Sequence, residues 1–313
     1  MSSFTIPVNI TSMHDIILWA EDELKKNDVY FGHGTNNALD EAAYLISYCA
    51  QKPINFTDED LAYSLTTTQR TKVAVVLQQR IEEKLPSAYI TNKAYFFGLE
   101  FEVNENVLVP RSPIAELIAE EFFPWLDINS HKKKHESLNI LDMCTGSGCI
   151  AIACATVFDD VDIVTSVDAV DISAEALEVA NRNIKKHKMD GRVNAIQSNM
   201  FNNVPLKKYD IIVSNPPYVT QEEIDDLPAE YHQEPSLGLF AAESGLEFAI
   251  TILKKAKDYL SDEGIVVIEV GNSAETLQNY YPKIPFTWIE FEMGGEGVFV
   301  LDAQQINQYH SQF

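Results

Sequence analysis

The strongest constraint on the fold is a repeated alternation of strand-like and helix-like segments that begins at residue 138. Runs of apolar residues predict strands over 138–143, 163–170, 193–197, 210–214 and 264–270, and over two aromatic-rich segments near 285–291 and 297–301. Helical spacing of apolar residues predicts helices over 147–157, 174–187 and 246–260. Because parallel strands need crossover connections, this order predicts a Rossmann-like α/β fold with a mostly parallel seven-stranded sheet.

The N-terminal region has a different pattern, which predicts a small helical domain. Apolar residues recur at helical spacing in 13–24 and 40–50, and Thr66 to Thr68 offer N-caps for a helix that ends at Leu85-Pro86. Aromatic and β-branched residues concentrate between 88 and 109, as in short strands and turns. We therefore expect a helical domain over 1–86, a β-hairpin connector over 87–112 and the α/β domain over 113–313.

The chain is strongly acidic, with a formal net charge of −24. This charge argues against binding through phosphate-backbone contacts and favours a neutral or basic macromolecular partner, although solubility alone would also explain it. The basic run from His131 to His135 is expected in a solvated loop after a helix over 113–123, since five residues cannot form a broad nucleic-acid surface.

Several classes of site and location are not supported by the sequence. No apolar run approaches the roughly 18 residues that a membrane span needs, and the N-terminal segment lacks the pattern of a secretory signal, so we expect a cytoplasmic protein that does not bind membranes. The four cysteines show no C-x-x-C spacing and the seven histidines are scattered. We therefore predict no metal site and structural thiols.

A glycine-bearing turn, Cys144-Thr145-Gly146-Ser147-Gly148, follows the first predicted strand of the sheet. Its glycines allow a backbone to approach a ligand without interference from a Cβ atom. Residues 146–151 also match the loose G-x-G-x-x-A pattern, which is typical of nicotinamide and adenosylmethionine binders alike. The turn predicts a cofactor site at the carboxyl ends of the strands.

Two further segments fall at the same end of the predicted sheet. Asp171 ends the second strand, where its carboxylate could accept both ribose hydroxyls of an adenosine; it could alternatively cap the next helix, a role that Ser173 could also fill. Residues 198–201 follow the third strand and should flank an adenine, unless they form a loop packed on the core. We favour the ligand-binding interpretation of Asp171.

The tetrapeptide Asn215-Pro216-Pro217-Tyr218 follows the fourth predicted strand, beside the expected cofactor. The two prolines fix φ and remove two backbone donors. The Asn215 side-chain oxygen and the Pro216 carbonyl could then accept the two hydrogens of a planar amino group, whose flat face Tyr218 would cover. The tetrapeptide predicts amino-group methylation, for which an amide nitrogen and adenine N6 present similar geometry. A proline turn with a core tyrosine is the structural alternative.

These residues resemble the protein-(glutamine-N5) methyltransferases. The resemblance spans nearly the whole chain and includes residues 95–98, 107–111, 142–148 and 215–218. It implies a class I methyltransferase fold, an N-terminal domain that recognises substrate, and transfer of a methyl group from S-adenosyl-L-methionine to a glutamine side-chain nitrogen, which leaves S-adenosyl-L-homocysteine.

The resemblance also implies roles for individual residues. It places at the acceptor glutamine Asn215, Pro216, Pro217 and Tyr218. It places at the cofactor Cys144, Thr145, Gly146, Ser147, Gly148, Asp171, Met200 and Asn215. This chain departs from the family at Asn199, where aspartate is common, and Met200 is less aromatic than the residue in some members.

Within the family, residues 110–118, 231–239, 269–273 and 286–291 resemble the branch that acts on ribosomal protein L3 of the large subunit. The release-factor branch typically reads Pro-Glu-Thr-Glu after its arginine, unlike Arg111-Ser112-Pro113 here. The resemblance therefore implies a basic ribosomal protein as substrate, without direct nucleic-acid binding. An acidic enzyme could attract such a substrate electrostatically.

Other functions remain open at this point. Release factors could be the substrate, and a nucleic-acid adenine-N6 methyltransferase could use the same tetrapeptide on a flipped base, although the acidic charge opposes it. A nicotinamide-dependent dehydrogenase would leave the tetrapeptide unexplained. A non-catalytic binding module would differ from an enzyme in tolerating Asn215→Ala.

Overall fold

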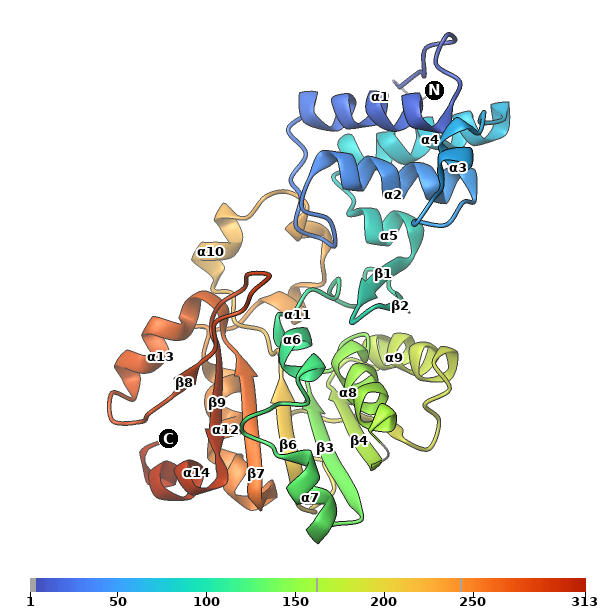
Figure 1. Ribbon diagram of the computed structural model, residues 1–313. Helices are drawn as coiled ribbons and strands as arrows, with labels where there is room; N and C mark the ends of the chain where they lie inside the picture. Colours follow the sequence, from blue (N-terminus) through green and yellow to red (C-terminus); the bar gives the residue numbers. More distant parts are fainter. Residues whose placement is uncertain (1–3, 162, 243) are drawn as a thin grey trace. The chain divides into compact units, whose positions relative to one another are not determined.

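The computed structural model describes residues 4–161, 163–242 and 244–313 (Figure 1). The chain forms two compact units. The helical unit contains the N-terminal region to Ala94, Val103–Glu105 and Leu227–Gln233, whereas the sheet unit contains Tyr95–Glu102, Asn106–Asp226 and Glu234–Phe313. The chain therefore passes from one unit to the other after residues 94, 102, 105, 226 and 233. Sequence patterns did not predict that Leu227–Gln233 belongs with the helical unit.

The helical unit is built from short helices, the first four of which have a side-chain N-cap. Their bounds are α1 (Met13–Lys26), α2 (Ala38–Ala50), α3 (Asp58–Ala62), α4 (Thr67–Ile81), α5 (Ser87–Thr91) and η1 (Tyr231–Gln233). Thr66 caps α4 in a capping box with Gln69, as its position predicted. Ile16, Leu45 and Leu77 are fully buried in the common core of α1, α2 and α4.

Helix α5 replaces a predicted extended segment. Tyr89 and Ile90 were expected in a strand, but both are buried residues of this one-turn helix, which begins directly after Pro86. Aromatic and β-branched residues in a short run do not distinguish a buried helix from a strand, and proline is well tolerated where a helix begins. Packing of Ile90 in the core of the helical unit therefore decides the local structure.

A buried arginine organises the helical unit. The side chain of Arg80 is 1% exposed, and its guanidinium forms ion pairs with Glu41 and, at 3.0 Å, with Glu230. It also donates to the backbone carbonyl of Tyr30 at 2.5 Å, and the Tyr30 N–H donates to Glu230 at 3.1 Å. These bonds hold Leu227–Gln233 to α2 and α4, because Glu230 belongs to that segment.

A short hairpin joins residues of the expected connector. Its strands, β1 (Lys93–Phe96) and β2 (Leu99–Glu102), form a two-stranded sheet. Phe97 and Gly98 between them have φ values of 53° and 70°, as a two-residue turn with positive φ at both positions requires.

The sheet unit contains the expected seven-stranded sheet, in the order β5-β4-β3-β6-β7-β9-β8. The five strands from β5 to β7 pair in parallel, and β9 is antiparallel to both β7 and β8. The predicted mostly parallel α/β fold is therefore confirmed. The strands are β3 (Ser137–Met143), β4 (Val164–Asp171), β5 (Val193–Gln197), β6 (Tyr209–Ser214), β7 (Leu260–Glu269), β8 (Thr287–Trp288) and β9 (Val298–Asp302).

Helices cover both faces of this sheet because successive strand residues point to opposite sides. Ile140 and Ile211 join one apolar core, and their neighbours Leu141 and Ile212 join the other. The first core includes residues of α6 (Ile114–Ala119), α8 (Cys149–Asp160) and α9 (Ala174–Lys186). The second includes residues of α12 (Glu247–Tyr259), α13 (Ala274–Tyr280) and α14 (Ala303–Tyr309). The smaller elements are α7 (Ile128–Lys134), α10 (Gln221–Asp226), α11 (Ser236–Leu239), η2 (Gly271–Ser273) and η3 (His310–Gln312).

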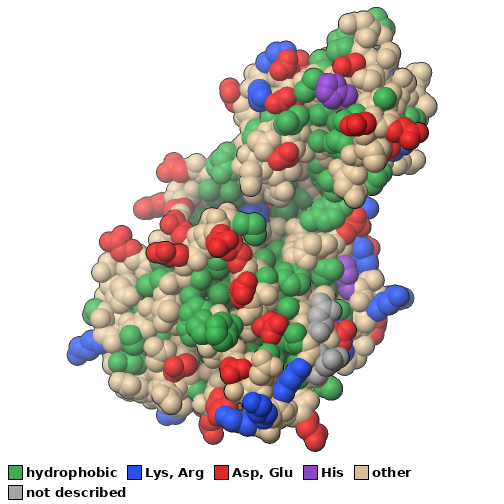
Figure 2. Space-filling model, in the orientation of Figure 1, with side chains coloured by type: hydrophobic (Ala, Val, Ile, Leu, Met, Phe, Trp, Pro, Cys, Tyr) green, Lys and Arg blue, Asp and Glu red, His purple; other side chains and the backbone are tan. Residues whose placement is uncertain are grey.

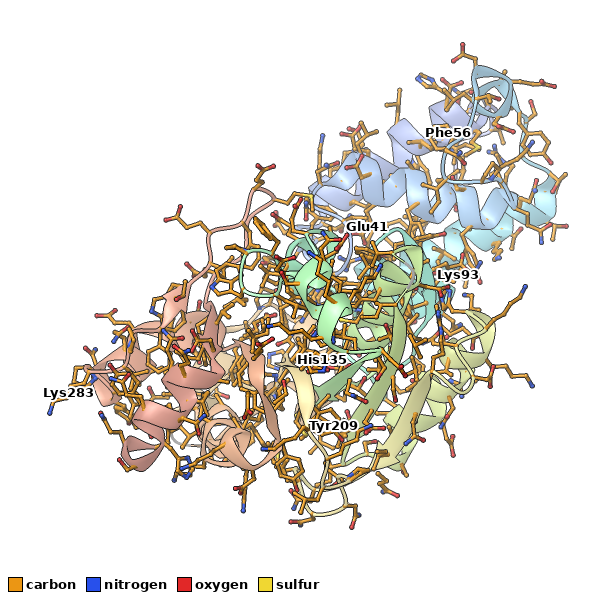
Figure 3. The ribbon with its side chains drawn as sticks, turned by 60° about the horizontal axis from the view of Figure 1, so that its bottom comes forward. Glu41, Phe56, Lys93, His135, Tyr209 and Lys283 are labelled. Atoms are coloured by element: carbon orange, nitrogen blue, oxygen red, sulfur yellow. The ribbon has the colours of Figure 1, made fainter. Side chains whose placement is uncertain are left out.

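The basic run from His131 to His135 corrects one expectation, because most of it forms helix α7 and not a loop. The Asp127 carboxylate caps this helix by accepting from the N–H groups of Asn129 and Ser130 at 3.0 and 3.1 Å. His131 is buried whereas Lys132–Lys134 are exposed, and basic side chains gather at the foot of the sheet unit in Figure 2. His135 follows the helix (Figure 3). Capping by Asp127 stabilises a helix in a run whose polar composition had suggested a loop.

Candidate active site

A cavity of about 340 Å³ opens in the sheet unit at the carboxyl ends of β3, β4 and β6. Parallel α/β sheets bind ligands at this edge. All but one of the predicted site residues line the cavity, namely Cys144, Thr145, Gly146, Ser147, Asp171, Met200, Asn215, Pro216, Pro217 and Tyr218. Gly148 is the exception: it caps α8 with a φ of +79°, and an added Cβ atom would lie 3.4 Å from that of Ala180. Its expected cofactor contact stays a prediction.

Backbone hydrogen bonds hold the glycine-bearing turn. The Thr145 N–H donates to the carbonyl of Val170, and the Gly148 N–H donates to the carbonyl of Thr145, both at 2.9 Å. Gly146 has a φ of +53°, and an added Cβ atom would meet no neighbouring atom within 4 Å. Glycine is therefore favoured at position 146 by backbone conformation, and it leaves the turn open toward a ligand.

The buried carboxylate of Asp142 stabilises the glycine-bearing turn through hydrogen bonds. The Asp142 Oδ2 atom accepts from the Thr145 hydroxyl at 2.5 Å and from the Ala151 N–H at 3.1 Å. Burial raises the pKa of Asp142 to about 7 against these two hydrogen bonds, which lower it. Within the described residues, its Oδ1 atom has no hydrogen-bond partner. Asp142 is therefore a structural support whose charge depends on pH near neutrality.

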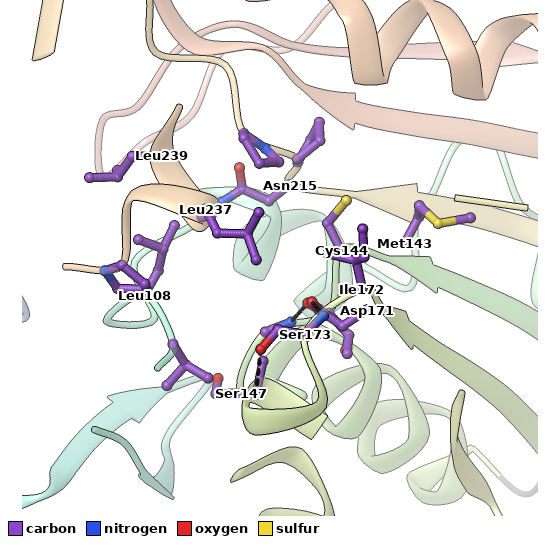
Figure 4. A pocket seen from close by; sticks show the side chains of 18 of the residues that line it. Leu108, Met143, Cys144, Ser147, Asp171, Ile172, Ser173, Asn215, Leu237 and Leu239 are labelled. Carbon is purple, nitrogen blue, oxygen red and sulfur yellow. Dashed lines mark hydrogen bonds between the residues drawn. The ribbon is translucent and has the colours of Figure 1, made fainter. Parts of the chain in front are cut away.

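Asp171 faces the cavity from the end of β4 (Figure 4). Its Oδ2 atom accepts from the Gly146 N–H and its Oδ1 atom from the Ser173 N–H, each at 2.9 Å. Ser173 is the N-cap of α9, since its hydroxyl accepts from the Ala176 N–H at 3.0 Å. Burial raises the pKa of Asp171. A carboxylate has about four acceptor positions, so Asp171 can accept further hydrogen bonds from a ligand.

The segment after β5 divides between cavity and core. Ser198, Asn199 and Met200 line the cavity, whereas Phe201 is buried in the apolar core, with its ring centroid 4.7 Å from that of Tyr259. The Ser198 hydroxyl donates to the Met200 carbonyl at 2.7 Å and fixes this loop. Asn199 is exposed. Phe201 therefore follows the core-packing alternative, and the expectation that residues 198–200 flank an adenine stays a prediction.

The tetrapeptide begins directly after β6. The buried Ser214 hydroxyl donates to the Met143 carbonyl at 2.6 Å, which fixes the ends of β6 and β3 against each other. Asn215 is half-buried and lines the same cavity as Asp171 (Figure 4). In the described part of the chain, no residue forms a hydrogen bond with the Asn215 side-chain amide. This amide can therefore bind a ligand without first losing a protein partner.

Tyr218 is held from two sides. Its hydroxyl donates to Glu269 Oε1 at 3.0 Å, and Glu269 Oε2 accepts from the Ser112 hydroxyl at 2.5 Å. Burial raises the pKa of Glu269, which is 5% exposed, and the two hydroxyls and Arg111 oppose this shift. An added Cβ atom at Gly271 would lie 2.5 Å from the Tyr218 ring, so only glycine fits there.

Arg111 and Glu234 form a second polar contact in the cavity wall. The guanidinium donates two hydrogen bonds to the Glu234 carboxylate, at 2.7 and 2.6 Å, and the Val109 N–H donates to Glu234 at 3.0 Å. The Glu234 side chain is fully buried. Because residues 106–112 and 235–239 contribute to the cavity wall, this pair joins two of its segments.

Sequence reasoning assigned no role to Glu269, Ser112, Arg111 or Glu234. Glu269 had a usable signal: a carboxylate that directly follows the apolar run 265–268 at the end of a strand. The other three residues lie outside strands, and their partners are more than 120 positions away in the chain, so no local pattern indicates them.

The remaining chemistry of the described residues is limited. Cys144 lines the cavity, but burial raises the pKa of its thiol, and burial raises that of Cys149 to about 12. Both thiols are therefore protonated and weakly nucleophilic at neutral pH. Residues 4–161, 163–242 and 244–313 contain no group of three or more His, Cys, Asp or Glu that could hold a metal ion. In the same ranges no helix is long and apolar enough to span a membrane.

Comparison with known proteins identifies the family. Residues 128–230 match the model of the methyltransferase small domain. The chain is 43% identical over 307 residues to the ribosomal protein uL3 glutamine methyltransferase of Francisella tularensis subsp. tularensis, covering 97% of this chain and 94% of that protein. It is 37% identical over 298 residues to the protein of the same name from Bordetella pertussis, covering 95% and 97%.

A solved structure supports the fold alone. The catalytic domain of hMettl16, in complex with MAT2A 3′UTR hairpin 1, is 16% identical to this chain, with 82% of this chain and 89% of that chain covered and a TM-score of 0.50. Identity across nearly the full length of both curated relatives carries more weight. The chain belongs to the family of ribosomal protein uL3 glutamine methyltransferases, which are S-adenosylmethionine-dependent enzymes.

Proposed function

We propose that this protein methylates the side-chain amide nitrogen of a glutamine in ribosomal protein uL3 (L3). The observation that carries this proposal is that Asn215–Tyr218 and the Asp171 carboxylate line one cavity, in a chain whose full-length relatives are named for this reaction. The tetrapeptide supports methylation of a planar amino group, and the relatives' names support uL3 as its source.

The cavity fits S-adenosyl-L-methionine. Asp171 offers acceptor positions to ribose hydroxyls, Gly146 leaves the turn open, and apolar groups including Ile150 and Ile172 line the walls. Ser198 to Met200 lie where an adenine would be flanked, with Asn199 offering a neutral amide in place of a carboxylate. When bound, this cofactor supplies a methyl group made electrophilic by the adjacent sulfonium.

The tetrapeptide would orient the acceptor amide. A primary amide is a poor nucleophile because its lone pair is delocalised into the carbonyl. The Asn215 side-chain oxygen and the Pro216 carbonyl would accept the two amide hydrogens, and Tyr218 would cover the flat face. Held in this way, the amide nitrogen would face the methyl group that the cofactor supplies, and on gaining it the nitrogen would release one proton to water. Alignment of the two reacting atoms supplies much of the rate.

The proposal includes a basic partner and a cytoplasmic location, where new ribosomal proteins meet a modifying enzyme before assembly. The net charge of −24 would attract a basic protein, and salt would weaken that attraction. Release factors and adenine N6 are the alternatives, since the same tetrapeptide suits either acceptor.

A labelling panel tests the substrate. The enzyme is incubated with methyl-labelled S-adenosylmethionine and, separately, with uL3, release factors, DNA and RNA. We expect label in uL3, and mass spectrometry should locate it on a glutamine side chain. Label only in nucleic acid or only in release factors would refute the substrate assignment. Equal association rates with uL3 at low and high salt would refute the electrostatic attraction.

A further inference from the structure

Glu269 is a buried carboxylate whose position is unusual for a purely structural group. It ends β7, lines the cavity beside Tyr218, and is 5% exposed. Each of its oxygens accepts a hydrogen bond from a hydroxyl group, that of Tyr218 at 3.0 Å and that of Ser112 at 2.5 Å. The bond to Tyr218 links Glu269 directly to the tetrapeptide, so an effect of Glu269 on the reaction can pass through this tyrosine.

The neighbouring charges favour an ionised Glu269. Arg111 faces it and lowers its pKa, while Arg111 itself forms the two-bond pair with Glu234. Burial is the larger effect and raises the pKa of Glu269, but the Tyr218 and Ser112 hydroxyls both donate to its oxygens, as they do to an ionised carboxylate. Negative charge held at a fixed place stabilises positive charge that develops nearby during a reaction.

The Tyr218 ring has little freedom to turn. Gly271 packs against it so closely that a Cβ atom would lie 2.5 Å from the ring, and at Gly245 a Cβ atom would lie 2.3 Å from the Tyr218 carbonyl oxygen. These contacts fix the backbone and the ring face, and the hydrogen bond to Glu269 fixes the hydroxyl end. Tyr218 is therefore held at its backbone, at its ring face and at its hydroxyl group.

We propose that Glu269 is a positioning residue for methyl transfer, which holds the Tyr218 ring against the acceptor amide and increases the electron density of that ring. This inference rests on the proposed function. An ionised acceptor polarises the phenol toward the ring, and an electron-rich face stabilises the positive charge that the amide nitrogen gains as its new bond to carbon forms.

The same unit contains a matched pair for comparison. Tyr209 on β6 donates its hydroxyl to the carboxylate of Asp168 on β4 at 2.7 Å, and Asp168 is 3% exposed (Figure 3). Neither belongs to the described residues that line the cavity. Tyr209→Phe removes this type of bond from the fold without touching the site, and Asp168→Asn removes in addition the ion pair of Asp168 with Lys207 at 2.9 Å.

The test compares Glu269→Gln with Asp168→Asn, and Tyr218→Phe with Tyr209→Phe. We expect Glu269→Gln to lower kcat about 10- to 100-fold with KM for uL3 and Kd for S-adenosylmethionine changed less than about threefold. Asp168→Asn and Tyr209→Phe should keep kcat within about twofold while lowering Tm. In the double variant Tyr218→Phe, Glu269→Gln, kcat should match that of Tyr218→Phe within about threefold, because both changes remove one interaction.

A second measurement does not depend on turnover. With tyrosine labelled by carbon-13 at Cζ, the Tyr218 resonance, identified by its loss in Tyr218→Phe, should move in Glu269→Gln and stay unchanged in Asp168→Asn. An unmoved resonance, or a wild-type kcat in Glu269→Gln, overturns the proposal. The proposal is also overturned if Glu269→Gln lowers kcat by the same factor in the wild-type enzyme and in Tyr218→Phe, because Glu269 would then act independently of the Tyr218 hydroxyl.

Two further outcomes are distinguished. If Glu269→Gln does not fold, Tyr218→Phe decides alone: a reduced kcat supports the proposal, and a wild-type kcat overturns it. If the wild-type enzyme methylates another acceptor of the panel, the substrate assignment is wrong, and the same ratios of kcat measured on that acceptor still test Glu269.

Discussion

The two halves of the cavity are held together in different ways. In the half that we propose for the cofactor, around residues 144–147 and Asp171 (the cofactor half), backbone N–H groups donate to a side chain, as from Gly146 to Asp171, which are 25 positions apart in the chain. In the half that we propose for the acceptor, around residues 215–218 (the acceptor half), side chains bond to side chains across 157 positions, from Ser112 to Glu269, and across 123, from Arg111 to Glu234. The first half depends mainly on backbone conformation, and the second depends on the identity of its side chains.

The largest expected effect belongs to the acceptor half. Asn215→Ala removes the side-chain oxygen proposed to accept an amide hydrogen, and we expect kcat to fall about 100- to 1,000-fold. Single-turnover kinetics with uL3 measures the loss. Near wild-type turnover in this variant would contradict the role of the Asn215 side chain and would leave the backbone carbonyl of Pro216 as the acceptor.

The next largest effect is expected for the ion pair between Arg111 and Glu234. Glu234→Ala leaves Arg111 and the Val109 N–H without their acceptor, and we expect the free energy of unfolding to fall by about 2 to 3 kcal/mol, since the Arg111 side chain remains partly in water. Urea unfolding measures it. An unchanged midpoint would mean that the wall does not depend on this pair.

A smaller effect is expected in the cofactor half. Asp171→Asn turns an amide hydrogen toward the Gly146 or Ser173 N–H and removes the charge, so we expect Kd for S-adenosylmethionine to rise about tenfold, with kcat at saturating cofactor little changed. Calorimetric titration measures Kd. The control, Asp168→Asn on the same strand, should keep the wild-type Kd, and an equal change in both variants would contradict a specific role for Asp171.

The last prediction concerns Asp142, which supports the glycine-bearing turn, and it is a dependence of stability on pH. The folded-state pKa of Asp142 is about 7, above its usual 3.8, so its protonated form favours folding. Its contribution is complete below pH 4 and is lost as pH rises toward 7, by at most about 1.4 kcal/mol per pH unit. Unfolding free energies of the wild type and Asp142→Asn, measured across this range, should converge or cross. Parallel curves would show that Asp142 does not titrate there.

The cofactor half could be predicted from sequence because its parts are local. An apolar strand, a glycine turn and a helix follow each other within 142–151, and Asp171 ends the next strand. Strand periodicity likewise predicted which residues enter the sheet. Gly148 shows the limit of such reasoning, because a glycine that the turn requires need not line the cavity.

The acceptor half could be predicted only in part. Asn215–Tyr218 is continuous and follows a buried strand, so its place was visible in the sequence. Glu269 and Ser112 meet only after the sheet has assembled, and no spacing rule joins residues that far apart. The helices α5 and α7 were missed for a related reason: core packing and a single capping carboxylate outweighed local composition.

The buried Arg80 has a consequence for how the chain folds during synthesis. Its partner Glu230 is not translated until 150 residues after Arg80 itself. A nascent chain ending at Ala94 already contains α1, α2 and α4, with Glu41 and the Tyr30 carbonyl as acceptors for Arg80. It lacks Glu230, which accepts from the Arg80 guanidinium and from the Tyr30 N–H in the complete unit. Completion of the helical unit therefore waits at least until Gln233 has been translated, when about three quarters of the 313 residues exist.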